Sequence, residues 1–119
     1  MSVVISPSIL AGNFLNLQQS LDIINSSEAE WVHVDVMDGV FVPNISFGFP
    51  VLKAVSTYCT KFIDVHLMIK QPNRYFSMLH EAGAQGLSIH FEGNHHLHRD
   101  LEEIQRLGMK AGLALNPQT

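Results

Sequence analysis

Apolar residues along this chain follow two different periods that alternate from one stretch to the next. In several short stretches rich in β-branched residues the apolar positions are two apart, which is typical of strands. Between these stretches they recur every three or four residues, as in helices with one buried side. The pattern predicts strands at residues 3–6, 31–37, 62–68, 86–91 and 110–117, and helices at residues 13–27, 49–58, 72–83 and 96–108.

The regular alternation of strands and helices favours parallel strands joined by right-handed helical crossovers. It fits either an open sheet with helices on both faces or a (β/α)8 barrel. The two faces of each strand separate these alternatives. Val32, Val34 and Val36 give one face of the second strand an apolar surface, whereas the opposite face carries polar residues. Because a barrel interior with an active site at its rim has this composition, we predict an α/β fold of the TIM (β/α)8 type.

The length of the chain suffices for only part of such a barrel. A complete barrel has eight βα units in about 250 residues, whereas these 119 residues hold four predicted units and a fifth strand. We therefore expect residues 1–119 to form one partial barrel domain, the N-terminal half, with the C-terminal half absent. A half-barrel exposes two edge strands, which are a known aggregation hazard. The chain is then either a fragment or a half that pairs with something else.

Composition and charge narrow the classes of partner. A hydrophobic content of 46% fits a folded domain, and the formal net charge of −4 without a basic cluster argues against nucleic-acid binding. No apolar stretch approaches the ~20 residues of a membrane-spanning helix, and the N-terminus lacks the basic segment of a secretory signal. The single Cys59 cannot form an internal disulfide. We therefore predict a cytoplasmic protein without nucleic-acid or membrane partners.

Polar residues on two neighbouring strands form the main candidate site. His33 and Asp35 are predicted on the inward face of one strand, and His66 on the inward face of the next. Because neighbouring parallel strands lie ~4.8 Å apart, these side chains can meet at one rim. Two imidazoles and a carboxylate suit Zn²⁺ or Fe²⁺. The alternative is a structural hydrogen-bond network without a metal, and the pattern alone leaves both open.

Further inward residues surround this group. Asp64 lies one position deeper than His66 and is expected either to orient that histidine or to have a structural role only. Met37 and Met68 either line the site or fill the core. Ser8 lies at the rim of the first strand, where it could equally serve the turn after Pro7.

Four histidines in or beside helices are expected at the surface, and a fifth faces inward. The expected surface residues are His80, His95, His96 and His98. His90, on the inward face of the strand at 86–91, is left without an assigned role.

Five stretches of the sequence resemble the ribulose-phosphate 3-epimerase family, in order and at the family's spacing. They are "ISPSIL", "WVHVDVMDGVFVPN", "DVHLM", "HLHR" and "AGLALNP". The resemblance covers the N-terminal half of the family's barrel. It implies that His33, Asp35 and His66 bind a divalent metal, Zn²⁺ or Fe²⁺, with Mn²⁺ or Co²⁺ as substitutes. It also implies that Asp35 is one of two acid/base carboxylates.

The same resemblance implies the reaction and the substrate contacts. The family epimerises C3 of a ketose phosphate, D-ribulose 5-phosphate to D-xylulose 5-phosphate, through an enediolate in the pentose phosphate pathway. Ser8, His66, Met37 and Met68 match residues that contact the substrate. The partner is then a small sugar phosphate, and a homo-oligomer is compatible with the sequence.

Two alternatives stay open beside this function. A hexulose-phosphate 3-epimerase would have the same N-terminal half, and the chain could be a non-catalytic metal-binding half-barrel. The family's second aspartate and its phosphate-binding Gly/Ser loops belong to later strands and are absent from this sequence. The 119-residue chain by itself is therefore expected to be inactive. Other barrel enzymes are disfavoured, because no lysine occupies an inward position for a Schiff base and no Asp-x-Lys-x-x-Asp pattern of the related decarboxylases occurs.

Overall fold

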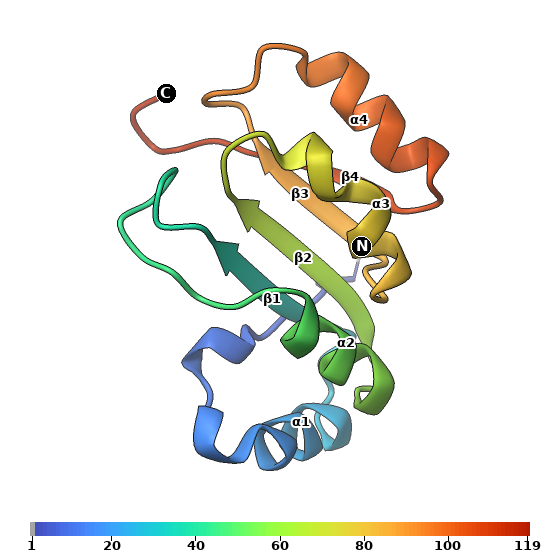
Figure 1. Ribbon diagram of the computed structural model, residues 1–119. Helices are drawn as coiled ribbons and strands as arrows, with labels where there is room; N and C mark the ends of the chain where they lie inside the picture. Colours follow the sequence, from blue (N-terminus) through green and yellow to red (C-terminus); the bar gives the residue numbers. More distant parts are fainter. Residues whose placement is uncertain (1) are drawn as a thin grey trace.

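The computed structural model describes residues 2–119 and contains a four-stranded parallel sheet in chain order (Figure 1). The strands are β1 (Trp31–Met37), β2 (Phe62–Met68), β3 (Gly86–His90) and β4 (Lys110–Ala114). The helices are α1 (Leu17–Ser26), α2 (Phe49–Tyr58), α3 (Phe76–Glu81) and α4 (Leu97–Arg106), and short 3-10 turns η1 (Ile9–Ala11), η2 (Phe14–Asn16) and η3 (Pro72–Tyr75) precede α1 and α3. This is the α/β arrangement of half a barrel, as predicted.

The predicted first strand at residues 3–6 does not form a regular ladder. The segment runs extended beside β1, where Ile5 O accepts a hydrogen bond from Trp31 N at 3.3 Å and Pro7 O accepts one from His33 N at 2.8 Å. Within residues 2–8, a strand-type bridge forms only at Ser8, which pairs with His33. Pro7 has no N–H group and cannot donate to the ladder. The segment therefore follows the course of a barrel strand with few strand bonds.

Two predicted elements are shorter or less regular in the structure. The strand predicted at 110–117 ends at Ala114, because the Asn116 N–H is donated to Glu92 Oε2 at 3.1 Å instead of to a neighbouring strand. The helix predicted at 72–83 starts as the 3-10 turn η3 and becomes α-helical only over α3.

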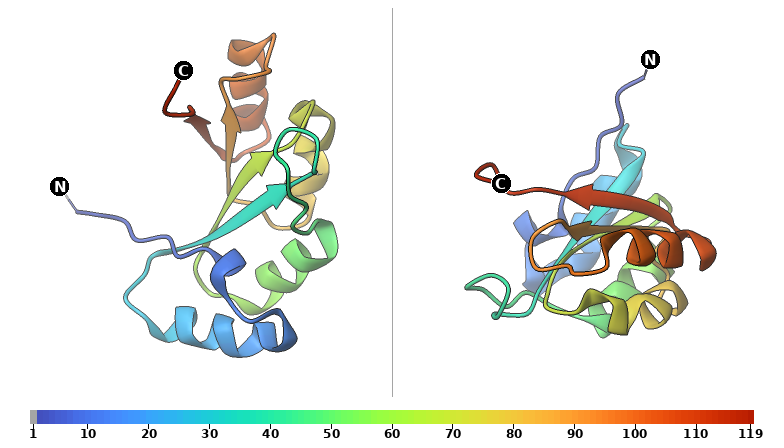
Figure 2. Two further views of the ribbon diagram at one scale, coloured as in Figure 1. Left: turned by 90° about the vertical axis from the view of Figure 1, so that its left-hand side faces the viewer. Right: turned by 90° about the horizontal axis from the view of Figure 1, so that it is seen from above.

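The hydrophobic core lies between the sheet and the helices. The strands contribute Val32, Val34, Ile63, Val65, Leu67, Leu87 and Ile89, all at most 3% exposed. Helices cover this face, whereas the opposite face of the curved sheet is left open (Figure 2). The predicted division into an apolar helix side and a polar inner side is confirmed.

Phe91, Leu113 and Leu115 continue the apolar period of the strands predicted at 86–91 and 110–117, which predicts that they lie under the helices, but they are exposed. Phe91 and Leu115 follow the ends of β3 and β4, and Leu113 lies in β4, which has a neighbouring strand on one side only. Among the described residues, no helix combines the length and the apolar character needed to cross a membrane.

Candidate metal centre

The register between β1 and β2 creates the candidate site. His33 lies directly opposite Asp64, and Asp35 lies directly opposite His66. Because side chains two apart on a strand share a face, all four project toward the open side of the sheet. Their side chains are 14 to 23% exposed, so they are shielded yet within reach of a ligand.

Asp35 is the centre of this group. Its Oδ1 lies 3.0 Å from His33 Nε2 and 3.3 Å from His66 Nδ1, while its Oδ2 accepts a hydrogen bond from Ser8 Oγ. Burial acts to raise the pKa of Asp35, but the hydrogen bonds from His33, His66 and Ser8 outweigh it and hold the pKa well below its ordinary value. Asp35 is therefore a carboxylate at neutral pH.

The donor atoms of this group fit a divalent ion. One ligand atom from each of His33, Asp35 and His66 lies within 4.8 Å of the others. Atoms bound tetrahedrally to Zn²⁺ at ~2.0–2.1 Å lie about 3.3 Å apart. The two distances from Asp35 Oδ1 to the imidazole nitrogens, 3.0 and 3.3 Å, match that spacing. The chemistry and the spacing of these residues thus suit Zn²⁺ or Fe²⁺.

Asp64 orients His33, and the expectation that it orients His66 is wrong. Asp64 Oδ2 lies 2.8 Å from His33 Nδ1. Two residues along one strand are ~6.6 Å apart, whereas opposite residues on neighbouring strands are closer. The register therefore places Asp64 beside His33. A proton on Nδ1 directed at Asp64 leaves Nε2 free for an ion, which is the usual role of a carboxylate behind a metal-binding histidine.

Hydrogen bonds to Asp35 and then to Asp64 raise the pKa of His33 to about 9, against the opposing effect of burial. The ring is therefore protonated at neutral pH in the metal-free protein. A metal ligand must present a lone pair, so an ion has to displace the Nε2 proton. Metal affinity should consequently increase as the pH rises toward 9.

We predict that Zn²⁺ binding at pH 7 releases about one proton from His33. Calorimetric titration in buffers of different ionisation enthalpy measures this number directly. The variant Asp64→Asn removes one of the two carboxylates that raise the pKa, so fewer protons should be released at pH 8. A binding enthalpy that is the same in every buffer would contradict the prediction.

The other predicted site residues lie around this group. Ser8 contacts Asp35, and Met37 and Met68 lie opposite each other where β1 and β2 end. Ser46, which the sequence analysis did not single out, accepts a hydrogen bond from Met37 N and donates one to Asp35 O at 2.7 Å. Ser46 thereby ties the loop after β1 to the strand. The roles of Ser8, His66 and the two methionines toward a substrate stay predictions.

A second histidine of the inner face reaches the site. His90 Nε2 lies 2.8 Å from His66 Nε2, and His90 Nδ1 lies 2.9 Å from Glu92 Oε1. Sequence reasoning placed His90 inward without a role and missed Glu92. The two-residue spacing from Ser88 to His90 to Glu92 was the available signal, because it keeps all three on one face. The four histidines expected at the surface are exposed.

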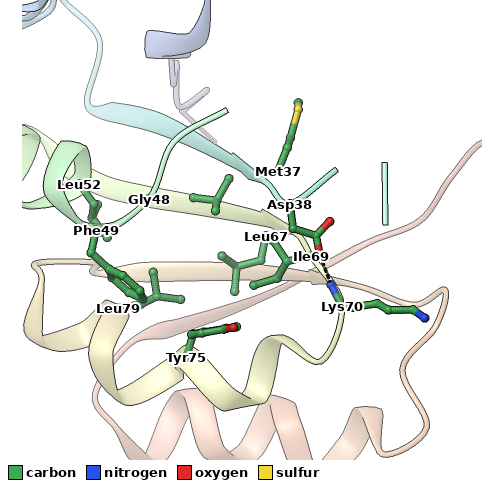
Figure 3. Close-up of a pocket in the computed structure, with 11 residues that line it drawn as sticks. Met37, Asp38, Gly48, Phe49, Leu52, Leu67, Ile69, Lys70, Tyr75 and Leu79 are labelled. Atoms are coloured by element: carbon green, nitrogen blue, oxygen red, sulfur yellow. Dashed lines mark hydrogen bonds between the residues drawn. The ribbon is translucent and has the colours of Figure 1, made fainter. Parts of the chain in front are cut away.

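An apolar cavity of about 250 Å³ lies on the other side of the sheet, between β1, β2, α2 and α3 (Figure 3). Leu52, Leu67 and Leu79 line it, and Lys70 N donates a hydrogen bond to Asp38 Oδ2 at 2.8 Å beside it. The Met37 side chain points away from these leucines in Figure 3. The cavity is part of the packing between sheet and helices, and it is separate from the polar group.

A half-barrel sheet with a histidine–aspartate–histidine group on its inner face defines a (β/α)8-barrel protein with a candidate metal centre. The chain belongs to the ribulose-phosphate 3 epimerase family, which it matches over residues 4–119. It is 45% identical over 120 residues to the ribulose-phosphate 3-epimerase of Synechocystis sp., covering 99% of this chain and 52% of that protein.

Other relatives match this chain with similar identity and coverage. The identity is 44% to the ribulose-phosphate 3-epimerase of Rhodobacter capsulatus, over 99% of this chain and 52% of the relative. It is 43% to that of Bacillus subtilis, over 98% of this chain and 54% of the relative. The chain thus spans about half the length of the curated relatives that it matches.

Proposed function

We propose that this chain provides the metal-binding half of an enzyme that epimerises C3 of a ketose phosphate, D-ribulose 5-phosphate. The observation that carries the proposal is Asp35, an ionised carboxylate contacted by two imidazoles on the inner face of a half-barrel. The names of the relatives support the same reaction. The proposed partner is a small sugar phosphate, and a cytoplasmic location stays a prediction.

The reaction needs a base beside C3 of the substrate. Epimerisation removes the proton next to the ketone and returns a proton to the opposite face. A divalent cation held by His33, Asp35 and His66 would supply a Lewis acid for the negative charge that develops on substrate oxygen. Asp35 Oδ1 faces the two imidazoles, so Oδ2, which accepts the Ser8 hydrogen bond, is the oxygen placed to take the proton.

A proton delivered to the opposite face requires a second acid. Among the described acidic residues near the site, Asp64 is engaged by His33 and Glu92 is separated from Asp35 by two histidines. We therefore propose that the second carboxylate and the phosphate contacts come from the half of the barrel that the relatives have beyond their match to this chain. The complete site would then form only when both halves are together.

An epimerase assay with two lengths of protein tests the proposal. We expect the complete protein, meaning a protein that contains these 119 residues together with the proposed second half of the barrel, to convert D-ribulose 5-phosphate. It should lose turnover after chelation and regain it with Zn²⁺ or Fe²⁺. The 119-residue chain alone should show no turnover with either metal, because one carboxylate cannot serve both faces. Full activity after complete metal removal would contradict the metal dependence.

Two further outcomes of this assay decide the alternatives. Turnover by the 119 residues alone would contradict the division of the site between two halves. A complete protein that binds metal but converts no ketose phosphate would favour the non-catalytic alternative. A preference for a hexulose phosphate over D-ribulose 5-phosphate would change the proposed substrate and leave the role of Asp35 in place.

A further inference from the structure

His66, His90 and Glu92 form a hydrogen-bond network that leads away from the candidate metal centre. His66 Nδ1 faces Asp35 Oδ1, and its Nε2 lies 2.8 Å from His90 Nε2. The other nitrogen of His90, Nδ1, lies 2.9 Å from Glu92 Oε1. This network therefore runs from β2 to β3 and ends at the Glu92 carboxylate just beyond β3.

When His66 binds an ion, only one placement of protons satisfies the hydrogen bonds of this network. A ligand nitrogen needs a free lone pair, so a neutral His66 that binds through Nδ1 carries its proton on Nε2. That proton can be donated only to an unprotonated His90 Nε2. A neutral His90 then carries its own proton on Nδ1 and donates it to Glu92, which as a carboxylate accepts it.

Further hydrogen bonds hold the His90 and Glu92 end of this network in place. The His90 side chain is 9% exposed, and its backbone O accepts a hydrogen bond from Asn94 Nδ2 at 2.8 Å. Glu92 Oε2 accepts hydrogen bonds from Asn116 N and from Thr119 Oγ1. The bonds from Thr119 and His90 lower the pKa of Glu92 to about 2, so it is ionised at neutral pH. The Glu92 carboxylate, the acceptor at the end of this network, is thus both fixed and charged.

We infer that His90 and Glu92 are positioning residues for His66: they fix its ring orientation and its tautomer, so that Nδ1 is presented to a divalent cation. The inference rests on the proposed metal site. It gives His66 the support that Asp64 gives His33, with one imidazole inserted between ligand and carboxylate. Partners of this kind behind metal-binding histidines typically change metal affinity 10- to 100-fold.

Zinc affinity of His90 variants in the complete protein tests this inference. Competition with a chromophoric zinc chelator should show about 10- to 100-fold weaker binding for His90→Leu, which cannot accept the proton of His66 Nε2. The variant His90→Gln keeps a carbonyl oxygen for His66 and an amide for Glu92, so it should recover most of the affinity. The control His80→Leu removes an exposed histidine and should bind zinc as wild type does.

The tautomer gives a readout that a merely structural role would not change. In the zinc-bound wild type, ¹⁵N NMR of the histidine rings should show the proton of His66 on Nε2 and that of His90 on Nδ1. If His90→Leu fails to fold, Glu92→Ala takes its place, because it leaves both rings intact; it should weaken zinc binding and alter the His90 ring signals.

The outcomes separate this inference from the proposed metal site. Wild-type zinc affinity and unchanged His66 ring signals in a folded His90→Leu protein would overturn the inference alone. Equal affinity and unchanged ring signals in Glu92→Ala would have the same consequence. A wild-type protein without zinc affinity would overturn the metal site, and the inference with it.

Discussion

Replacing Asp35 with asparagine should lower the epimerase kcat of the complete protein by about 10⁴-fold. Asparagine keeps the shape of the side chain but cannot accept a proton from C3 of the substrate. Loss of a positioned general base alone costs about 10²–10⁴-fold. The amide also removes the negative charge that His33 and His66 both contact, which weakens the metal centre. The measurement is steady-state turnover of D-ribulose 5-phosphate, with the metal content of both proteins determined in parallel.

The matched control is Asp22→Asn. Asp22 is an exposed residue of α1 that contacts Tyr58, outside the candidate metal centre. The same chemical change there should leave turnover and metal content as in wild type. If Asp35→Asn kept turnover within tenfold of wild type, Asp35 could not be the base, whatever its effect on metal binding.

The largest effect on folding is expected for Ile104→Ala in α4. Ile104 is 0% exposed and belongs to the hydrophobic core between helices and sheet. Removing the buried methyl and methylene groups should lower the free energy of unfolding by about 2–5 kcal/mol. Natural domains are stable by only about 5–15 kcal/mol, so this change removes much of that margin. Urea unfolding followed by circular dichroism measures the effect.

Ile23→Ala provides the comparison for this core substitution. Ile23 also lies in a helix, α1, but its side chain is 66% exposed. The change in helix propensity is the same at both positions, so the difference between the two variants isolates burial. We expect Ile23→Ala to alter the free energy of unfolding by no more than about 0.5 kcal/mol. Equal losses for both variants would contradict the burial of Ile104.

The local sequence pattern was sufficient for the order of the elements and for the composition of the two faces. Strand periodicity is a property of neighbouring residues, so Val32 and Val34 could be placed under the helices and His33 and Asp35 on the inner face. The same periodicity placed His66 and His90 inward. For these reasons the sequence pattern alone predicts the group His33, Asp35 and His66.

Tertiary structure alone decided which inward residues meet. The register of β1 against β2 places Asp64 beside His33 and not beside His66. The contact between β2 and β3 places His90 against His66. A shift of two residues between neighbouring strands keeps every side chain on its own face of the sheet but exchanges its partners on the next strand. Register is set by packing across the whole sheet, so the proton-bearing contacts behind each proposed metal ligand lay beyond what the sequence determines.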